Sequence, residues 1–170
     1  MRNIALSAAV LLGLAAGALA GGAPASAKSS PEFERMKSLA GTWKGESSSH
    51  GQKGPAEATY KLTSGGSVVL ETLDPGTPHE MVTLYHDAGG KLVMTHYCAM
   101  GNQPRMAVRK STPEALEFGY VHTEGIDTRR DAHMHSLKLI MKDKDSLEQR
   151  WTDFKNGKPN GEAVFNLKRS

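Results

Sequence analysis

The thirteen residues from Met94 to Met106 concentrate side chains that could bind a metal or act as a nucleophile. The segment, MTHYCAMGNQPRM, contains three methionines, one histidine, one tyrosine and the only cysteine of the chain. A second segment, residues 131–136, contains two histidines separated by one residue, His133 and His135. Thiolate, thioether and imidazole groups suit copper(I), and a thiol beside an imidazole is used in nucleophilic catalysis. Both segments are therefore candidates for a metal site, a catalytic site or the wall of a ligand pocket.

A metal site in these segments would take its ligands from His96, Cys98, His133 and His135. Alternate residues of one strand lie about 7 Å apart, at a rise of about 3.3 Å per residue, so a shared metal requires a ligand from a second strand. The sequence contains no C-x-x-C or H-E-x-x-H pattern, and we expect no resident metal. It also contains no G-x-S-x-G elbow and no phosphate-binding loop, so no enzyme activity is expected.

Two further side chains of the first segment raise separate questions. Cys98 cannot form a disulfide within the chain, because there is no second cysteine. Since free cysteine usually packs as a small hydrophobic residue, we expect it to be buried. Arg105 follows Pro104 at the edge of a turn, where its guanidinium either meets a carboxylate of a ligand at a barrel mouth or lies on the surface.

Alternation along the first segment predicts that its sulfur and imidazole groups share a face. From Lys91 to Met100 the odd positions hold valine, threonine, tyrosine and alanine. Successive side chains of a strand point to opposite faces. The side chains at the even positions are softer and unbranched at Cβ. We expect them to line an interior cavity; they are Leu92, Met94, His96, Cys98 and Met100.

The same test places the two histidines of residues 131–142 on an interior face. Ser136, Lys138 and Lys142 share a parity and are expected to face water, which turns His133 and His135 inward. Buried polar groups need partners, so these histidines should bond each other, a carboxylate, a water or a ligand. Tyr120 has the parity of the apolar residues before it, Leu116 and Phe118, and is expected to join the cavity wall.

Turn signals divide the chain into the short elements that would position these side chains. Ser30-Pro31-Glu32 is typical of a helix start, and the apolar stripe after it predicts a short helix over residues 31–40 that Gly41 ends. From Gly41 onward, runs of about five to nine residues, many with period-two alternation, lie between turns rich in Gly, Asn, Asp and Pro. This predicts about eight to ten strands. We therefore predict an all-β fold, a single closed or nearly closed antiparallel up-and-down barrel over residues 31–170.

The first residues have the pattern of a signal peptide rather than of a domain. Arg2 is followed by a short apolar run over residues 4–20, and small residues offer cleavage after Ala20 or Ala27. We assign residues 1–27 to a signal peptide and linker, and expect a periplasmic or secreted protein with no membrane segment after cleavage. The net charge of +3 includes Arg2, and the basic residues are scattered among acidic ones. Nucleic acid is therefore not an expected partner.

The segment Leu39–Gly45, LAGTWKG, resembles the opening of the calycin barrels, which include lipocalins, fatty-acid-binding proteins and nitrobindin-like proteins. In these families a Gly-x-Trp pattern begins the first strand after a short helix, and the tryptophan closes the barrel bottom. Gly41 and Trp43 match this pattern. The resemblance implies a basic partner for the tryptophan on the last strand, Lys168 or Arg169, in a cation–π contact.

Nearly the whole mature chain resembles a bacterial group of exported lipocalin-like proteins with no established activity, through residues 78–82, 95–98, 101–106 and 131–136. The nitrobindin branch continues the glycine pattern at every second position and binds haem through a histidine. Gly45 fits that pattern, but Ser47 and Ser49 stand where the next two glycines would be, which disfavours haem. If haem were bound, His133 or His135 would be the first axial candidates.

These observations predict a barrel that binds a small, largely apolar or aromatic molecule in its interior. The expected wall consists of Met94, His96, Cys98, Tyr120, His133 and His135, with Arg105 at the mouth. No cofactor is expected, and haem or copper is the alternative. A second alternative is a barrel that binds nothing, in which the two histidines are bonded to Asp131 or Tyr97 in the core.

Overall fold

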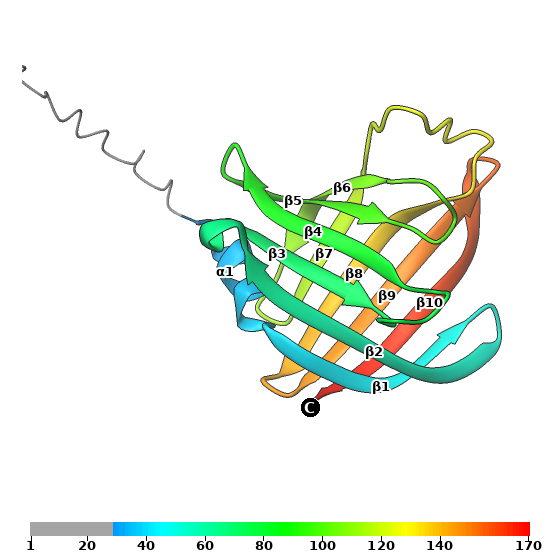
Figure 1. The fold of residues 1–170 in the computed structure, drawn as a ribbon. Coiled ribbons are helices and arrows are strands. Elements are labelled where there is room, and N and C mark those ends of the chain that lie inside the picture. Colours follow the sequence, from blue (N-terminus) through cyan, green and yellow to red (C-terminus); the bar gives the residue numbers. More distant parts are fainter. Residues whose placement is uncertain (1–28) are drawn as a thin grey trace, which may run out of the picture.

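Residues 29–170 form a closed barrel of ten antiparallel strands in the computed structural model, which describes this part of the chain (Figure 1). Each strand pairs with its neighbour in sequence, and β1 also pairs with β10, which closes the ring. This confirms the predicted all-β up-and-down barrel. The predicted signal peptide and linker lie outside the described residues. The strands are β1 (Gly41–Ser49), β2 (Gln52–Thr63), β3 (Val68–Leu73), β4 (Met81–Ala88), β5 (Lys91–Tyr97), β6 (Arg105–Ser111), β7 (Ala115–Val121), β8 (His133–Asp143), β9 (Ser146–Lys155) and β10 (Lys158–Arg169).

One α-helix, α1 (Pro31–Ser38), precedes the strands in this part of the chain, and a 3₁₀ turn, η1 (Ser64–Gly66), joins β2 to β3. The Ser30 hydroxyl caps α1 by accepting a hydrogen bond from the Phe33 amide at 3.1 Å, as the sequence predicts. The helix is two residues shorter than the predicted 31–40, because the chain leaves it through a tight turn at Leu39. Gly41 does not end the helix but begins β1, with a φ of 127°. Among the described residues, no helix is long and apolar enough to cross a bilayer.

The helix covers one end of the barrel and is fixed there by polar contacts. Its N-cap residue, Ser30, donates from its amide and its hydroxyl to the carboxylate of Asp87, near the end of β4, at 2.6 and 2.7 Å. Arg35 donates to the backbone carbonyl of Thr112 in the β6–β7 turn at 2.7 Å. The apolar face of the helix, with Phe33 and Met36, is buried in the core.

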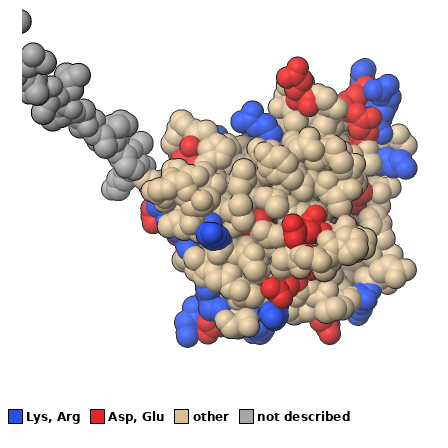
Figure 2. Space-filling view, viewed as in Figure 1, with Lys and Arg blue, Asp and Glu red and all other residues tan. Residues whose placement is uncertain are grey.

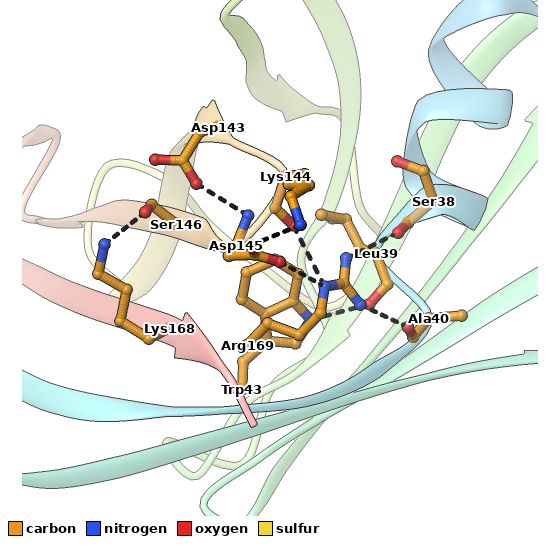
Figure 3. Close-up of polar contacts among 10 residues, drawn as sticks. All are labelled: Ser38, Leu39, Ala40, Trp43, Asp143, Lys144, Asp145, Ser146, Lys168 and Arg169. Carbon is orange, nitrogen blue, oxygen red and sulfur yellow. Dashed lines mark hydrogen bonds and ion pairs between the residues drawn. The ribbon is translucent and has the colours of Figure 1, made fainter.

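Trp43 and Arg169 complete this closed end (Figure 3). The buried Trp43 indole donates to the Leu39 carbonyl at 2.8 Å, and the Arg169 guanidinium lies 4.2 Å from the centre of the indole ring. The guanidinium also donates to the carbonyls of Ala40 and Ser38, at 2.8 and 3.0 Å. Of the two basic residues expected to contact the tryptophan, Arg169 does so, whereas Lys168 donates to the Ser146 hydroxyl at 2.5 Å.

Gly45 lies where β1 and β10 approach each other closely. A Cβ atom at this position would stand 1.9 Å from the backbone carbonyl oxygen of Asn166. The glycine two residues beyond Trp43 is therefore required by strand packing. The opposite end of the barrel, between the β1–β2 hairpin and the β3–β4 loop, is open and contains the site described next.

Candidate functional site at the open end of the barrel

A cavity of about 630 Å³ opens at the end of the barrel that is remote from α1. Its volume lies in the range of sites for small molecules. The β1–β2 hairpin and the β3–β4 loop form its polar rim, which includes Gln52, Lys53, Asp74 and His79. The deeper wall is mainly apolar and consists of Leu73, Met81, Met134, Trp151, Ala163 and Phe165. The one imidazole in that deeper wall belongs to His96 on β5.

His96 lines this cavity and has one ring nitrogen without a hydrogen-bond partner among the described residues. Its side chain is 1 % exposed, and its Nδ1 lies 2.9 Å from the hydroxyl of Thr83. Its ring centre is 4.5 Å from that of Trp151. The other ring nitrogen, Nε2, is buried and has no hydrogen-bond partner among residues 29–170. Burial lowers the pKa of His96 to about 4, so the imidazole is neutral at physiological pH.

A buried carboxylate, Glu71 on β3, is separated from His96 by one strand, β4. It accepts hydrogen bonds from three side chains. The hydroxyls of Tyr60 and Tyr85 each donate to one of its oxygens at 2.7 Å. The amide nitrogen of Gln149 donates to Oε1 at 2.6 Å. Burial raises the pKa of Glu71, while these hydrogen bonds act in the opposite direction by favouring the charged form.

The orientation of Gln149 is fixed by Trp151, whose indole N–H can only donate. It donates to Gln149 Oε1 at 2.8 Å, so the amide nitrogen must face Glu71 and Tyr60. Burial and the neighbouring carboxylate raise the pKa of both tyrosines well above the usual range, which keeps their hydroxyl protons available to Glu71. The polar network behind the cavity therefore extends from Trp151 in the wall to the carboxylate.

Glu71 and its partners were not predicted from the sequence, although β3 contains a signal. In the run VVLETL, Glu71 has the parity of Val69 and Leu73, both of which are buried. A carboxylate at an inward position of an apolar strand indicates a buried partner. The identity of those partners depends on β2, β4 and β9, which only the closed barrel brings together.

The expectation that His133 and His135 point into the interior is wrong, because a β-bulge at His135 interrupts the alternation. The pairing of β8 with β9 shifts between Met134 and Ser136. Before the shift, Met134 is opposite Asp153 and lines the cavity, so the interior face belongs to Met134. His133 is opposite Phe154, on the other face of the sheet.

The two histidines instead form an aromatic cluster at the outer face of β8 and β9. His133 Nε2 lies 3.0 Å from His135 Nδ1, and His133 Nδ1 lies 2.8 Å from the backbone carbonyl of Asp131. The His135 ring stacks on Phe154 at 3.8 Å and on Tyr120 at 5.4 Å between ring centres. Of the partners considered for these histidines, namely each other, a carboxylate, a water or a ligand, the structure shows the first. Burial, together with His133, lowers the pKa of His135.

The remaining predicted site residues occupy different positions. Met94 and Cys98 are buried, as expected, and burial raises the pKa of the Cys98 thiol. Met100 is 43 % exposed, because β5 ends at Tyr97 and the alternation stops there. Arg105 is exposed at the start of β6. Of the predicted wall residues, only His96 lines the described cavity, and Met94, Cys98, Tyr120, His133, His135 and Arg105 do not.

The donor set does not fit the copper or haem sites considered from the sequence. Within residues 29–170, no group of three or more His, Cys, Asp and Glu side chains is arranged to hold a metal ion. Both ring nitrogens of His133 are engaged, and His135 is stacked between aromatic rings away from the cavity. Neither histidine is therefore available as an axial ligand to a haem in the barrel.

Comparison with known proteins adds no family assignment to this geometry. Neither a protein-family model nor a curated protein sequence matches the chain. The site itself is an apolar cavity, open to solvent, with the neutral imidazole of His96 in its deep wall.

Proposed function

We propose that this protein binds a small, largely apolar or aromatic molecule in the cavity at the open end of its barrel. The observation that carries this proposal is His96 Nε2, a buried polar atom in the cavity wall without a protein partner among the described residues. A buried acceptor or donor left unpaired is unfavourable, so such an atom is typical of a position that a ligand completes. The apolar wall supplies the burial energy, and the single nitrogen would orient the ligand.

We also propose that the barrel is calycin-like, and the arrangement of its closed end supports this. A short helix, the Gly41–Trp43 pattern and an arginine of the last strand stacked on the tryptophan are the features that the resemblance implies. Sealing one end by packing leaves the other as the route by which a ligand enters. A barrel fold alone does not define a function, and the ligand-binding proposal depends on the cavity and His96.

Binding in the cavity is tested with an aromatic probe and a matched pair of variants. We expect 2-naphthol to shift the NMR signals of the Trp151 indole and the Met134 methyl group. Ala163→Phe places a ring in the cavity wall and should weaken binding by at least about tenfold. Val164→Phe adds the same ring at the next residue of β10, outside the cavity lining, and should leave binding unchanged. Equal binding by both variants would show that the probe binds outside this cavity. Absence of binding by the wild type would refute the proposal.

We further propose that the protein is exported and acts in the periplasm or outside the cell. Cleavage after Ala20 or after Ala27 would leave residues 29–170 whole, including the Ser30 cap of α1. N-terminal sequencing of protein recovered from the periplasmic fraction should begin at residue 21 or 28. An N-terminus at Met1 in that fraction would contradict cleavage. Native mass spectrometry of the same sample would identify a retained ligand, and its absorption spectrum and metal content would test for haem or copper.

A further inference from the structure

Glu71, Thr83 and His96 lie side by side across three neighbouring strands. The register pairs Glu71 of β3 with Thr83 of β4, and Thr83 with His96 of β5. All three side chains are buried, with at most 1 % of their surface exposed. The Thr83 hydroxyl contacts His96 Nδ1 at 2.9 Å, and its proximity acts to lower the pKa of Glu71, against the effect of burial. Thr83 therefore lies between the Nδ1 side of the imidazole and the carboxylate. His96 lines the cavity, and its buried Nε2 has no partner among residues 29–170.

The protons of the network can be assigned from the donors around Glu71. Oε1 receives hydrogen bonds from Tyr60 and from Gln149, whose orientation Trp151 fixes, so Oε1 has no room for a proton. Oε2 accepts a hydrogen bond from the hydroxyl of Tyr85. Both oxygens thus act as acceptors, which is the state of an ionised carboxylate.

This negative charge decides where the neutral imidazole keeps its single proton. A neutral histidine has one N–H, and its position is set by the partner of the other nitrogen. Because the carboxylate lies on the Nδ1 side, the proton is favoured on Nδ1, where it is donated to the Thr83 hydroxyl. Thr83 in turn directs its own proton toward the carboxylate side. Nε2 is then left with a lone pair.

We infer that His96 presents an unprotonated Nε2 to the cavity, and that the ligand is a small, largely apolar molecule with a hydroxyl or N–H group directed at this nitrogen. This ligand class rests on the proposed binding function and narrows it. A site built to accept a hydrogen bond discriminates against an analogue that lacks the donor, because the buried acceptor then stays unpaired. An anionic group at the same point would face both the lone pair and the Glu71 charge, so neutral donors such as phenols, alcohols and indoles are favoured.

The tautomer can be measured in the free protein, independently of any ligand. Two-bond ¹H–¹⁵N correlation spectra of the histidine rings should show His96 protonated on Nδ1 and bare on Nε2. Thr83→Val preserves the shape of the side chain and removes the hydroxyl that accepts the Nδ1 proton. In this variant the Nε2-protonated tautomer should become populated. A wild-type His96 protonated on Nε2 would overturn the inference while leaving the cavity proposal intact.

Ligand discrimination is tested with two probes that share a naphthalene ring, one with a hydroxyl group and one with a methyl ether in its place. 2-Naphthol should bind about tenfold more tightly than 2-methoxynaphthalene, as one hydrogen bond to a buried acceptor predicts. His96→Phe keeps a planar ring and removes both nitrogens, and should abolish this preference. The control His135→Phe alters an imidazole outside the cavity wall and should retain it. Equal affinity of the wild type for both probes would overturn the inference alone. Failure to bind either probe would refute the binding function and the ligand class together.

Discussion

His96 and Glu71 are the two buried residues on which the proposed ligand site depends. Both side chains are buried in the barrel, but they differ in how far their hydrogen bonds are satisfied. Both oxygens of Glu71 accept hydrogen bonds, whereas Nε2 of His96 has no partner among residues 29–170. A carboxylate without compensating donors would be strongly unfavourable in this environment, so Tyr60, Tyr85 and Gln149 are stability residues. Burial keeps the imidazole of His96 neutral, and its Nε2 has no hydrogen-bond partner among residues 29–170.

Removal of the Glu71 carboxylate is expected to destabilise the barrel strongly. Glu71→Ala leaves the hydroxyls of Tyr60 and Tyr85 without their acceptor in the core, so the free energy of unfolding should fall by about 3–5 kcal/mol. Urea denaturation measures this change. Glu117→Ala removes a carboxylate that pairs with Lys138 at the surface and should have a much smaller effect. Similar losses for the two variants would contradict the structural role of the network.

The buried imidazole of His96 should make stability depend on pH. Its folded pKa of about 4 lies below the ordinary value of 6.5, so between these pH values the unfolded chain binds a proton that the folded protein does not. Stability from this source is complete above pH 6.5 and is lost as the pH falls toward 4, by about 3 kcal/mol in total. Glu71 acts in the opposite direction, because its folded pKa is raised.

Comparison of the wild type with His96→Phe isolates this contribution, since Glu71 is common to both. Urea denaturation at several pH values from 4 to 7 should give a smaller increase of stability with pH for the variant. The same slope in both proteins would show that His96 is not the titrating group.

At the scale of elements, irregular positions in the strands decide which side chains reach the cavity. The bulge at His135 turns Met134 inward and leaves both histidines in the outer cluster. The end of β5 at Tyr97 releases Met100 to solvent. Regular alternation holds between these points, as in the buried positions of β3 and β5.

Gly45 provides a test of the packing between β1 and β10. Gly45→Ala places a methyl group against the Asn166 carbonyl and should reduce the free energy of unfolding by about 3 kcal/mol, because backbone atoms must move. Gly54→Ala, in the neighbouring strand β2, meets no atom within 4 Å and should change stability by less than about 0.5 kcal/mol. Equal effects in thermal or urea unfolding would show that the strands separate more easily than the structure implies.

The whole molecule is a ring of paired strands, sealed at one end and open at the other (Figure 1). Closure through β1 and β10 leaves no free strand edge in residues 29–170 for association with other chains. On the face shown in Figure 2, basic side chains lie among acidic ones rather than in one continuous patch. The small-molecule proposal depends on the cavity whose mouth lies at the open end of the barrel.

Every strand of the barrel pairs with two neighbours, so separating one strand removes pairing from the strands beside it. Unfolding should therefore be a single cooperative transition. Trp43 reports on the sealed end and Trp151 on the cavity, and they are the only tryptophans of the chain. The variants Trp43→Phe and Trp151→Phe each retain one reporter. In each variant, fluorescence and far-ultraviolet circular dichroism should give the same urea midpoint. A lower fluorescence midpoint at the cavity end alone would indicate local opening there.

The sequence by itself determined the class of fold, the short helix and the burial of Met94, His96 and Cys98. These properties depend on local signals: turn residues, caps and alternation over one strand. The tertiary structure alone decided that His133 and His135 lie outside the cavity and that Glu71 stands behind His96. The bulge depends on how β8 pairs with β9, and the network joins residues as far apart as Tyr60 and Gln149. Such contacts exist only after the barrel closes, because closure brings distant strands to the same interior point.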